Sequence, residues 1–165
     1  INGDIIFDID IERFFKYHKK KGADATIFTH PNSHPYDSGL IFVDKEGFVT
    51  EWLHKEDART RYKNRVNAGL HLLSPKIFAM FQEAKKTDLD RDILKKLILG
   101  HQLAAYDSPE YVKDMGTPDR YKSVSNDMKN GLVYAKNLKN KQKAVFFDRD
   151  GTINVYKGSL TKPEE

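Results

Sequence analysis

The chain has 165 residues, of which 39% are hydrophobic, 12% aromatic and 32% charged, a composition that excludes an intrinsically disordered protein. Its length suffices for one sizeable domain, or for one domain and part of another. It has no cysteine, which excludes disulfides and thiolate metal sites, and it has neither a long apolar run nor a leader pattern, so we expect a cytoplasmic protein without a membrane partner.

The charge balance is mildly basic, with a net charge of +4 and a pI near 9.1. Such a charge is compatible with nucleic acid, an acidic membrane surface or small phosphorylated substrates. The densest basic run, residues 16–21, stands just before Gly22, where cations favour the negative end of a helix dipole. A solvated helix end explains this run better than a nucleic-acid patch, so we expect no nucleic-acid partner.

In chain order, the first four residues, Ile1-Asn2-Gly3-Asp4, predict the carboxyl end of a buried strand that opens onto a carboxylate. Strand tips in open α/β sheets are where ligands bind, and a carboxylate there suits a hard cation beside a phosphate. A turn explains the Asp equally well, because Asp commonly follows Gly in turns. The meaning of Asp4 therefore depends on other residues.

Hydrophobic periodicity, helix caps and Gly or Pro breakers predict an alternating series of strands and helices, and hence an α/β fold. The predicted caps of the first three helices are Asp10, Ser74 and Asp88. The predicted elements are a helix over residues 11–21, a strand over 25–29, a hairpin of 40–44 and 48–53, a strand over 66–73, helices over 75–81 and 89–99, strands over 103–106 and 111–113, and a helix from 118. Gly69 interrupts one of these strands, which predicts a close backbone approach at that point.

The carboxyl-terminal part divides into two regions. Residues 126–142 are rich in Lys and Asn, which predicts a helical or irregular linker. An apolar strand is predicted over 144–147, and it is followed directly by Asp148-Arg149-Asp150-Gly151-Thr152. We therefore expect a first domain over 1–128, a linker over 129–142, and the first strand and loop of a second domain over 143–165.

Two acids, Asp4 and Asp114, each stand at the end of a predicted strand with a glycine within two residues. We predict that they converge on one Mg²⁺, which prefers oxygen ligands and is usually held by one or two carboxylates plus substrate phosphates. Such an ion offsets the charge that builds on a phosphorus centre during in-line displacement.

Four blocks stand in a fixed order: Asn2-Gly3-Asp4, Trp52-Leu53-His54-Lys55, Val66-Asn67-Ala68-Gly69 and Asp114-Met115-Gly116-Thr117-Pro118. With them, residues 1–127 resemble the sugar-phosphate nucleotidyltransferases, which join a sugar 1-phosphate to a nucleoside triphosphate and release pyrophosphate. The resemblance implies a Rossmann-like, GT-A-like mixed sheet with flanking helices. It also implies a fold incomplete at its amino end, because the family's glycine-rich phosphate loop would precede Ile1.

The same resemblance implies roles for particular residues. Asp4 and Asp114 would hold Mg²⁺, Lys55 would contact the sugar phosphate, and Asn67 with Gly69 would line the sugar pocket. Lys55 is flanked by His54 and Glu56, where the family more often has Glu and Pro. The implied partners are a sugar 1-phosphate of heptose or mannose type and a nucleoside triphosphate, with GTP expected.

The block after the predicted strand over 144–147 resembles the start of the haloacid-dehalogenase phosphatases. That likeness implies Asp148 as a nucleophile that forms an aspartyl-phosphate and Asp150 as the general acid and base. Residues 153–158 look like the branch that acts on sugar bisphosphates and histidinol phosphate. The two resemblances together imply a fused, bifunctional enzyme, in which a bisphosphate loses one phosphate before the remaining 1-phosphate receives a nucleotide.

Three alternatives stay open. The first is a haloacid-dehalogenase sugar-bisphosphate phosphatase with an accessory domain. The second is a catalytically silent sugar-phosphate-binding or regulatory module. The third concerns assembly, since the chain could form a homo-oligomer. His30 and His34 have ligand-like spacing, but their loop position and the lack of a third ligand argue against zinc. With Asp37, they are instead candidates for reaching the sugar phosphate.

Overall fold

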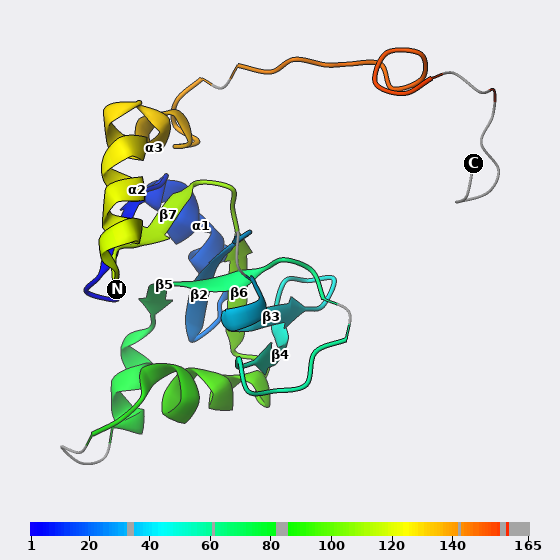
Figure 1. Cartoon of the computed structure of the whole chain (residues 1–165). Coiled ribbons are helices and arrows are strands. Elements are labelled where there is room, and N and C mark those ends of the chain that lie inside the picture. Colours follow the sequence, from blue (N-terminus) through cyan, green and yellow to red (C-terminus); the bar gives the residue numbers. More distant parts are fainter. Residues whose placement is uncertain (33–34, 61, 82–85, 142, 156–157, 159–165) are drawn as a thin grey trace.

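The computed structural model describes residues 1–165 apart from 33–34, 61, 82–85, 142, 156–157 and 159–165. Its centre is a five-stranded mixed sheet with the order β4-β3-β5-β2-β6, beside a two-stranded ribbon of β1 and β7 (Figure 1). The strands are β1 Ile5–Asp8, β2 Ala25–His30, β3 Leu40–Val43, β4 Val49–Leu53, β5 Val66–Leu73, β6 Leu103–Asp107 and β7 Tyr111–Asp114. Among the seven strands of the described residues, β2 and β6 pair in parallel, and the other pairs are antiparallel.

The helices flank this sheet, so the structure is the mixed α/β sheet with flanking helices that the sequence predicts. They are α1 Ile11–Lys21, α2 Pro118–Lys129 and α3 Leu132–Ala135, the 3-10 helices η1 Pro35–Asp37, η2 Pro75–Met80 and η4 Leu94–Ile98, and the π-helical turn η3 Leu89–Ile93. None of the described helices is both long and apolar enough to cross a membrane.

Helix α1 forms where the sequence predicts it, because both of its ends are capped. The Asp10 carboxylate accepts a hydrogen bond from the Arg13 backbone N–H, at 3.0 Å. Gly22 takes the left-handed conformation, with φ of 62°, and its N–H donates to the His18 carbonyl. The helix buries Phe14 against the sheet, and its basic last turn complements the helix dipole.

The sheet is covered on both faces. On one face, helices η2, η3 and η4 contribute Ile77, Ile93, Leu94 and Leu97 to a core with the hairpin of β3 and β4. On the other face, α1 and the ribbon pack around aromatic side chains that include Phe14, Phe28 and Tyr106. Since both faces are covered, the first five residues of β2 are all buried, including the polar Thr26 and Thr29.

The prediction that residues 1–4 end a buried strand is wrong. They form an exposed turn, and the strand β1 begins only at Ile5. The apolar run after Asp4 supplies the strand, since it pairs antiparallel with β7, with Ile5 opposite Asp114. Asp4 therefore precedes a strand and Asp114 ends one, and the antiparallel pairing sets them side by side.

The two helices predicted over residues 75–81 and 89–99 are present as short 3-10 and π-helical turns. The predicted caps are correct: the Ser74 side chain accepts from the Lys76 N–H, and the Asp88 side chain accepts from the N–H groups of Asp90 and Arg91. Asp90, in the second of these segments, accepts a hydrogen bond from the Asn67 amide of β5 at 3.2 Å.

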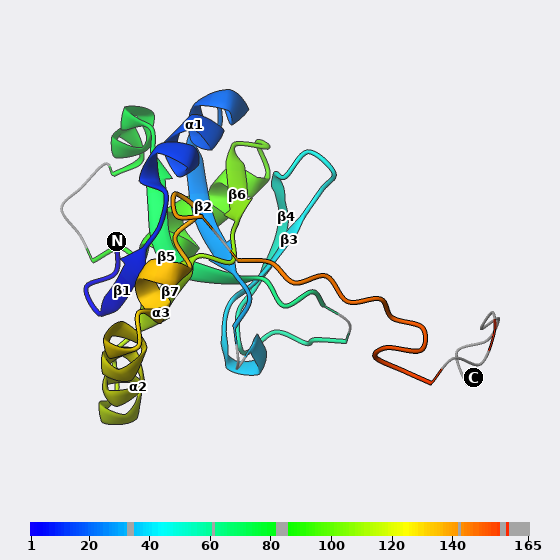
Figure 2. The same cartoon turned by 90° about the horizontal axis from the view of Figure 1, so that it is seen from above.

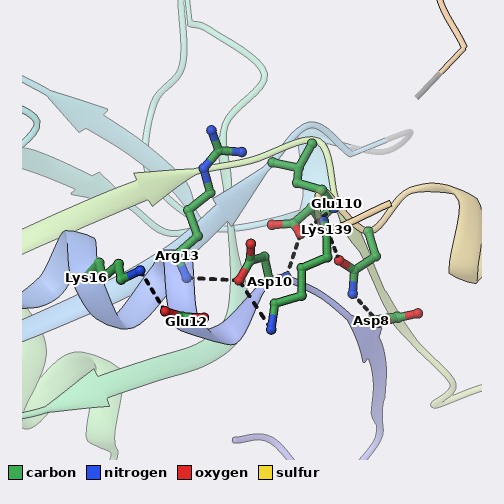
Figure 3. Close-up of polar contacts among 9 residues, drawn as sticks. Asp8, Asp10, Glu12, Arg13, Lys16, Glu110 and Lys139 are labelled. Carbon is green, nitrogen blue, oxygen red and sulfur yellow. Dashed lines mark hydrogen bonds and ion pairs between the residues drawn. The ribbon is translucent and has the colours of Figure 1, made fainter. Parts of the chain in front are cut away.

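A buried carboxylate ties the chain after α3 to the ribbon. Glu110, only 2% exposed, accepts hydrogen bonds from the backbone N–H groups of Asp10 and Leu138 and from the Ser108 hydroxyl. The Asn137 amide donates to Asp8 at 2.6 Å. Figure 3 shows these contacts gathered where β1 passes into α1, with Lys139 beside Asp10. Residues 137–139, inside the predicted linker, are thus packed against the first domain.

The predicted strand over residues 144–147 is not formed. No strand pairs with this segment among the described residues, and Val145, Phe146 and Phe147 are 74%, 94% and 68% exposed. In Figures 1 and 2 the chain leaves the body of the fold after α3. A strand needs a neighbour for its backbone hydrogen bonds, and an apolar run alone does not supply one.

Candidate functional site

A cavity of about 670 Å³ opens between the turn before β1, the strands β5 and β7, and the helices α2 and α3. Its lining comes both from the ribbon with α2 and from the five-stranded sheet. The lining residues are Asn2, Asp4, Ile5, His30, Pro31, Asn32, Ser38, Gly39, Trp52, Asn67, Ala68, Gly69, Asp90, Pro109, Glu110, Tyr111, Val112, Lys113, Asp114, Arg120, Asp127, Leu132 and Lys136.

Asp4 and Asp114 both line this cavity and lie next to each other. The Met115 N–H donates to the Asp4 carbonyl at 2.7 Å, which extends the pairing of β1 with β7 by one step. A Cβ atom at Gly116 would lie 3.2 Å from Asp4 Oδ2 and 3.7 Å from Asp114 Oδ1. Both carboxylates therefore reach the same point, and the absence of a side chain at residue 116 leaves that point open.

This donor set fits a hard divalent cation that keeps some of its ligands from water or substrate. Two carboxylates are a usual protein contribution to a Mg²⁺ site. Among the described residues no group of three or more His, Cys, Asp or Glu side chains is placed to hold a metal. Asp4 and Asp114 would hold the ion, with phosphate oxygens and water as the remaining ligands.

Asn67 is held in one orientation at the cavity wall. Its amide oxygen accepts from the Gly69 N–H at 3.2 Å and contacts His71 Nε2 at 3.2 Å, while its amide nitrogen donates to Asp90 Oδ2 at 3.2 Å. With both ends of the amide engaged, the remaining N–H is the group that Asn67 can offer to a ligand.

Gly69 shows the close approach that the sequence predicts. Its φ is +73°, and a Cβ atom there would lie 2.6 Å from Asn2 Nδ2 and 2.9 Å from Asn2 Cγ. The Asn2 N–H donates to the Gly69 carbonyl at 3.0 Å. The strand β5 bulges here, between the pairs Ile27–His71 and Thr29–Asn67. The glycine thus docks the turn that carries Asp4 onto β5.

His71 and Asp90 both contact the Asn67 amide, His71 at its oxygen and Asp90 at its nitrogen. Burial lowers the pKa of the His71 imidazole to about 4, so this side chain, 3% exposed, is neutral at neutral pH. Burial, and secondly the charge of Asp88, raises the pKa of Asp90 above its ordinary value. The 3.9 Å contact between His71 and Asp90 is therefore not an ion pair at neutral pH.

Cationic side chains surround the acids at the α2 end of the cavity. Arg120 Nη1 lies 2.7 Å from Asp114 Oδ1. Lys113 donates to Ser123 Oγ at 2.7 Å and to Asp127 at 3.2 Å. The hydrogen bond from the Tyr111 hydroxyl, together with Lys113, holds the pKa of Asp127 below its ordinary value. This end of the cavity offers positive charge beside carboxylates, as a site for phosphate and a cation requires.

Other predicted residues lie elsewhere. Lys55 stands in the exposed turn after β4 and is not among the cavity's lining residues. His30 lines the cavity, whereas His34 lies outside the described residues. Asp148 is exposed, and Asp150 is paired with Arg149 at 2.8 Å in an exposed turn of the tail. The structure therefore brings together Asp4, Asp114, Asn67 and Gly69 but does not bring Lys55 to them.

Asp90 and Arg120 line the cavity and were not among the predicted site residues. The sequence carried a weak signal for each, since Asp90 follows a helix cap by two residues and Arg120 follows the Gly116-Thr117-Pro118 turn. Their positions depend on contacts with β5 and β7, which are distant in sequence. Periodicity alone does not show those contacts.

Comparisons with known proteins agree with this fold. The model of the family described as Nucleotidyl transferase matches residues 1–131. A probable mannose-1-phosphate guanylyltransferase 3 of Oryza sativa subsp. japonica is 26% identical over 122 residues, which cover 73% of this chain and 33% of that protein. A mannose-1-phosphate guanylyltransferase of Mycobacterium tuberculosis is 24% identical over 135 residues, covering 80% and 37%.

A solved structure gives the same likeness in fold. The crystal structure of a putative glucose-1-phosphate thymidylyltransferase from Bacillus anthracis, in complex with a sucrose, superposes with a TM-score of 0.60 at 20% identity. The superposition covers 79% of this chain and 52% of that one. The chain spans about a third of the length of the curated relatives it matches.

Proposed function

Since the chain belongs to the Nucleotidyl transferase family, we propose that its protein transfers a nucleotidyl group from a nucleoside triphosphate, with GTP as donor, to a sugar 1-phosphate of mannose or heptose type. The products are a nucleotide-sugar and pyrophosphate. The mannose-1-phosphate guanylyltransferases among the relatives support GTP and the mannose type, whereas the heptose type is proposed from the sequence resemblance alone.

One observation carries the proposal: the pairing of Ile5 with Asp114 sets the Asp4 and Asp114 carboxylates against the same glycine at the edge of a polar cavity. We propose that these two carboxylates hold Mg²⁺, which when bound offsets the charge that develops on the α-phosphorus. An oxygen of the sugar phosphate attacks that phosphorus, the bond to the β-phosphoryl oxygen breaks, and pyrophosphate leaves.

A second group of lining residues supports a sugar subsite. Asn67 keeps one N–H for a ligand, and the Asp90 carboxylate beside it is able to accept hydrogen bonds from hydroxyl groups. The bulge at Gly69 brings backbone to the cavity surface without an intervening side chain. A sugar ring is recognised through such amide, carboxylate and backbone groups. Lys55 stays a predicted phosphate contact, which requires the turn after β4 to move toward the cavity.

Pyrophosphate release by the full-length protein tests the function. We expect release with GTP and mannose 1-phosphate or a heptose 1-phosphate, and a loss of kcat on the order of 100-fold or more in Asp114→Asn. The matched control is Asp119→Asn, an exposed carboxylate five residues along the chain that does not line the cavity. Near-normal activity of Asp114→Asn with Mg²⁺ would remove the assignment.

A second activity is supported by the tail. Large apolar side chains are normally buried, yet Val145, Phe146 and Phe147 are exposed directly before Asp148 and Asp150. We propose that this run is the first strand of a haloacid-dehalogenase phosphatase domain, with Asp148 as nucleophile and Asp150 as general acid and base. Such a domain would make the protein bifunctional, removing one phosphate from a sugar bisphosphate.

Phosphate release from a heptose bisphosphate by the full-length protein tests this second activity. Asp148→Asn is expected to abolish phosphate release and to leave pyrophosphate release unchanged, because no described residue of the tail lines the cavity. Phosphate release that persists in Asp148→Asn would rule out the nucleophile.

A further inference from the structure

The ion pair between Arg120 and Asp114 occupies a carboxylate that the proposed reaction needs for a cation. Arg120 Nη1 lies 2.7 Å from Asp114 Oδ1, and the two side chains are 39% and 31% exposed. Both line the cavity. An oxygen that accepts a charge-assisted hydrogen bond from a guanidinium has fewer lone pairs for a metal ion, and the guanidinium repels a second positive charge.

The position of Arg120 is set by the start of α2. The Thr117 side chain caps the helix by accepting from the Arg120 backbone N–H at 3.3 Å, and Pro118 occupies the first turn. The backbone of Arg120 is therefore fixed, so a change of partner would take place within its long side chain, which is 39% exposed. Arginine suits such an exchange because its planar fork matches both carboxylate and phosphate.

The neighbouring cation does not serve this purpose. Lys113, which also lines the cavity, is held by Ser123 at 2.7 Å and by Asp127 at 3.2 Å. Asp4 Oδ2 approaches the same point beside Gly116 as Asp114 Oδ1, and Arg120 is paired with Asp114 there. Arg120 is thus the cation that the carboxylate pair would release.

Building on the proposed function, we propose that Arg120 exchanges partners during the reaction cycle. Without substrate it neutralises Asp114; when Asp114 ligates a divalent cation, Arg120 leaves that carboxylate and binds a phosphate oxygen of the substrate. The exchange makes cation binding and phosphate binding strengthen each other, because both require the Arg120–Asp114 ion pair to break and the first ligand to bind has already broken it. The phosphate belongs either to the sugar 1-phosphate or to the nucleoside triphosphate.

Mn²⁺ binding to the full-length protein, measured by titration without nucleotide or sugar, tests the first half of the exchange. Arg120→Gln is expected to bind Mn²⁺ about two- to fivefold more tightly than the wild type, the range for release of one partly exposed ion pair. Arg120→Lys keeps the charge and is expected to stay near the wild type. Lys122→Gln is the matched control, since Lys122 is exposed on α2 and does not line the cavity.

The second half is tested by repeating the Mn²⁺ titration with mannose 1-phosphate in one arm and GTP in the other. In the wild type, one of these ligands is expected to tighten Mn²⁺ binding more than it does in Arg120→Gln and Arg120→Lys, and that arm identifies the phosphate. Equal tightening in all three proteins in both arms would overturn the exchange, as would unchanged Mn²⁺ affinity of Arg120→Gln without ligand.

Asp114→Asn separates this inference from the function it builds on. If Asp114→Asn binds Mn²⁺ as tightly as the wild type, the proposed metal site itself fails. If Asp114→Asn weakens Mn²⁺ binding while Arg120→Gln leaves it unchanged, only the exchange fails. Thermal unfolding of each variant shows whether it is folded at the titration temperature.

Discussion

At the scale of single residues, Gly69 connects the backbone of β5 to the turn that carries Asp4. Gly69→Ala is expected to lower the free energy of unfolding by roughly 1–3 kcal/mol. The backbone of residue 69 has a left-handed φ that alanine adopts with strain, and the new Cβ atom would clash with the Asn2 side chain. Urea denaturation measures the change. Gly3→Ala is the control, since no atom lies within 4 Å of its Cβ position, and a change within about 0.5 kcal/mol is expected there. Equal effects of both substitutions would contradict this account.

His71 gives a pH prediction of definite sign. Burial lowers its pKa from 6.5 to about 4, so the folded chain binds the proton less readily than the unfolded chain. The stability that the neutral imidazole contributes is complete above about pH 6.5 and is lost as the pH falls toward about 4, amounting to about 3 kcal/mol.

An NMR titration of the His71 ring and urea unfolding between pH 7 and 4 check this prediction. We expect the ring signals to stay constant down to about pH 5. Unfolding of His71→Gln is expected to depend less steeply on pH than unfolding of the wild type over this range, since the variant lacks the titrating group. A ring midpoint near 6.5 in the folded protein would be inconsistent with the buried, neutral side chain.

The sequence predicted part of the site correctly at this scale. The close approach at Gly69 and the helix caps at Asp10, Ser74 and Asp88 were predicted correctly. Residue type and the neighbouring residues in the sequence are enough to predict such features. The positions of Asp90 and Arg120 depend on strands far away in the chain, and no local pattern marks them. The roles of Asp4, Asp114, Asn67 and Lys55 remain predictions that the proposed experiments test.

At the scale of elements, Glu110 holds together the start of α1, the start of β7 and the chain after α3. Glu110→Gln is expected to cost roughly 1–3 kcal/mol, because the new amide NH₂ would face backbone donors in a buried site. Hydrogen exchange at Leu138 is expected to speed up at the same time. The control is Glu12→Gln, since Glu12 is paired with Lys16 on the exposed face of α1 and should leave stability unchanged.

The elements that were predicted wrongly share one physical cause. The sequence shows an apolar run at residues 144–147 and places Asp4 beside another apolar run. Whether such a run forms a strand depends on a pairing strand, which is often distant in the sequence and which no local pattern identifies. The run after Asp4 finds β7, and the run at 144–147 finds no strand among the described residues. The helices, whose hydrogen bonds are internal, were placed correctly, although η2, η3 and η4 are tighter or looser than α-helices.

At the scale of the whole molecule, the packed body ends near Asn140, and the described residues 143–155 after it are all exposed. A chain ending at Asn140 is expected to melt at the same temperature as the whole chain, because the apolar side chains of the tail are already exposed. A chain ending at Asn130 would lose the bond from Leu138 to Glu110 and melt at least about 2–4 °C lower. Calorimetry of the two truncations decides where the first domain ends.

The ribbon of β1 and β7 has a consequence for folding rate. Its partners, such as Ile5 and Asp114, lie about a hundred residues apart, whereas the hairpin of β3 and β4 closes locally. Closing so long a loop is entropically costly, so the ribbon is expected to join only after the sheet has formed. During synthesis on the ribosome, Asp4 emerges long before its partner carboxylate exists. The cation site would therefore be among the last parts of the molecule to assemble.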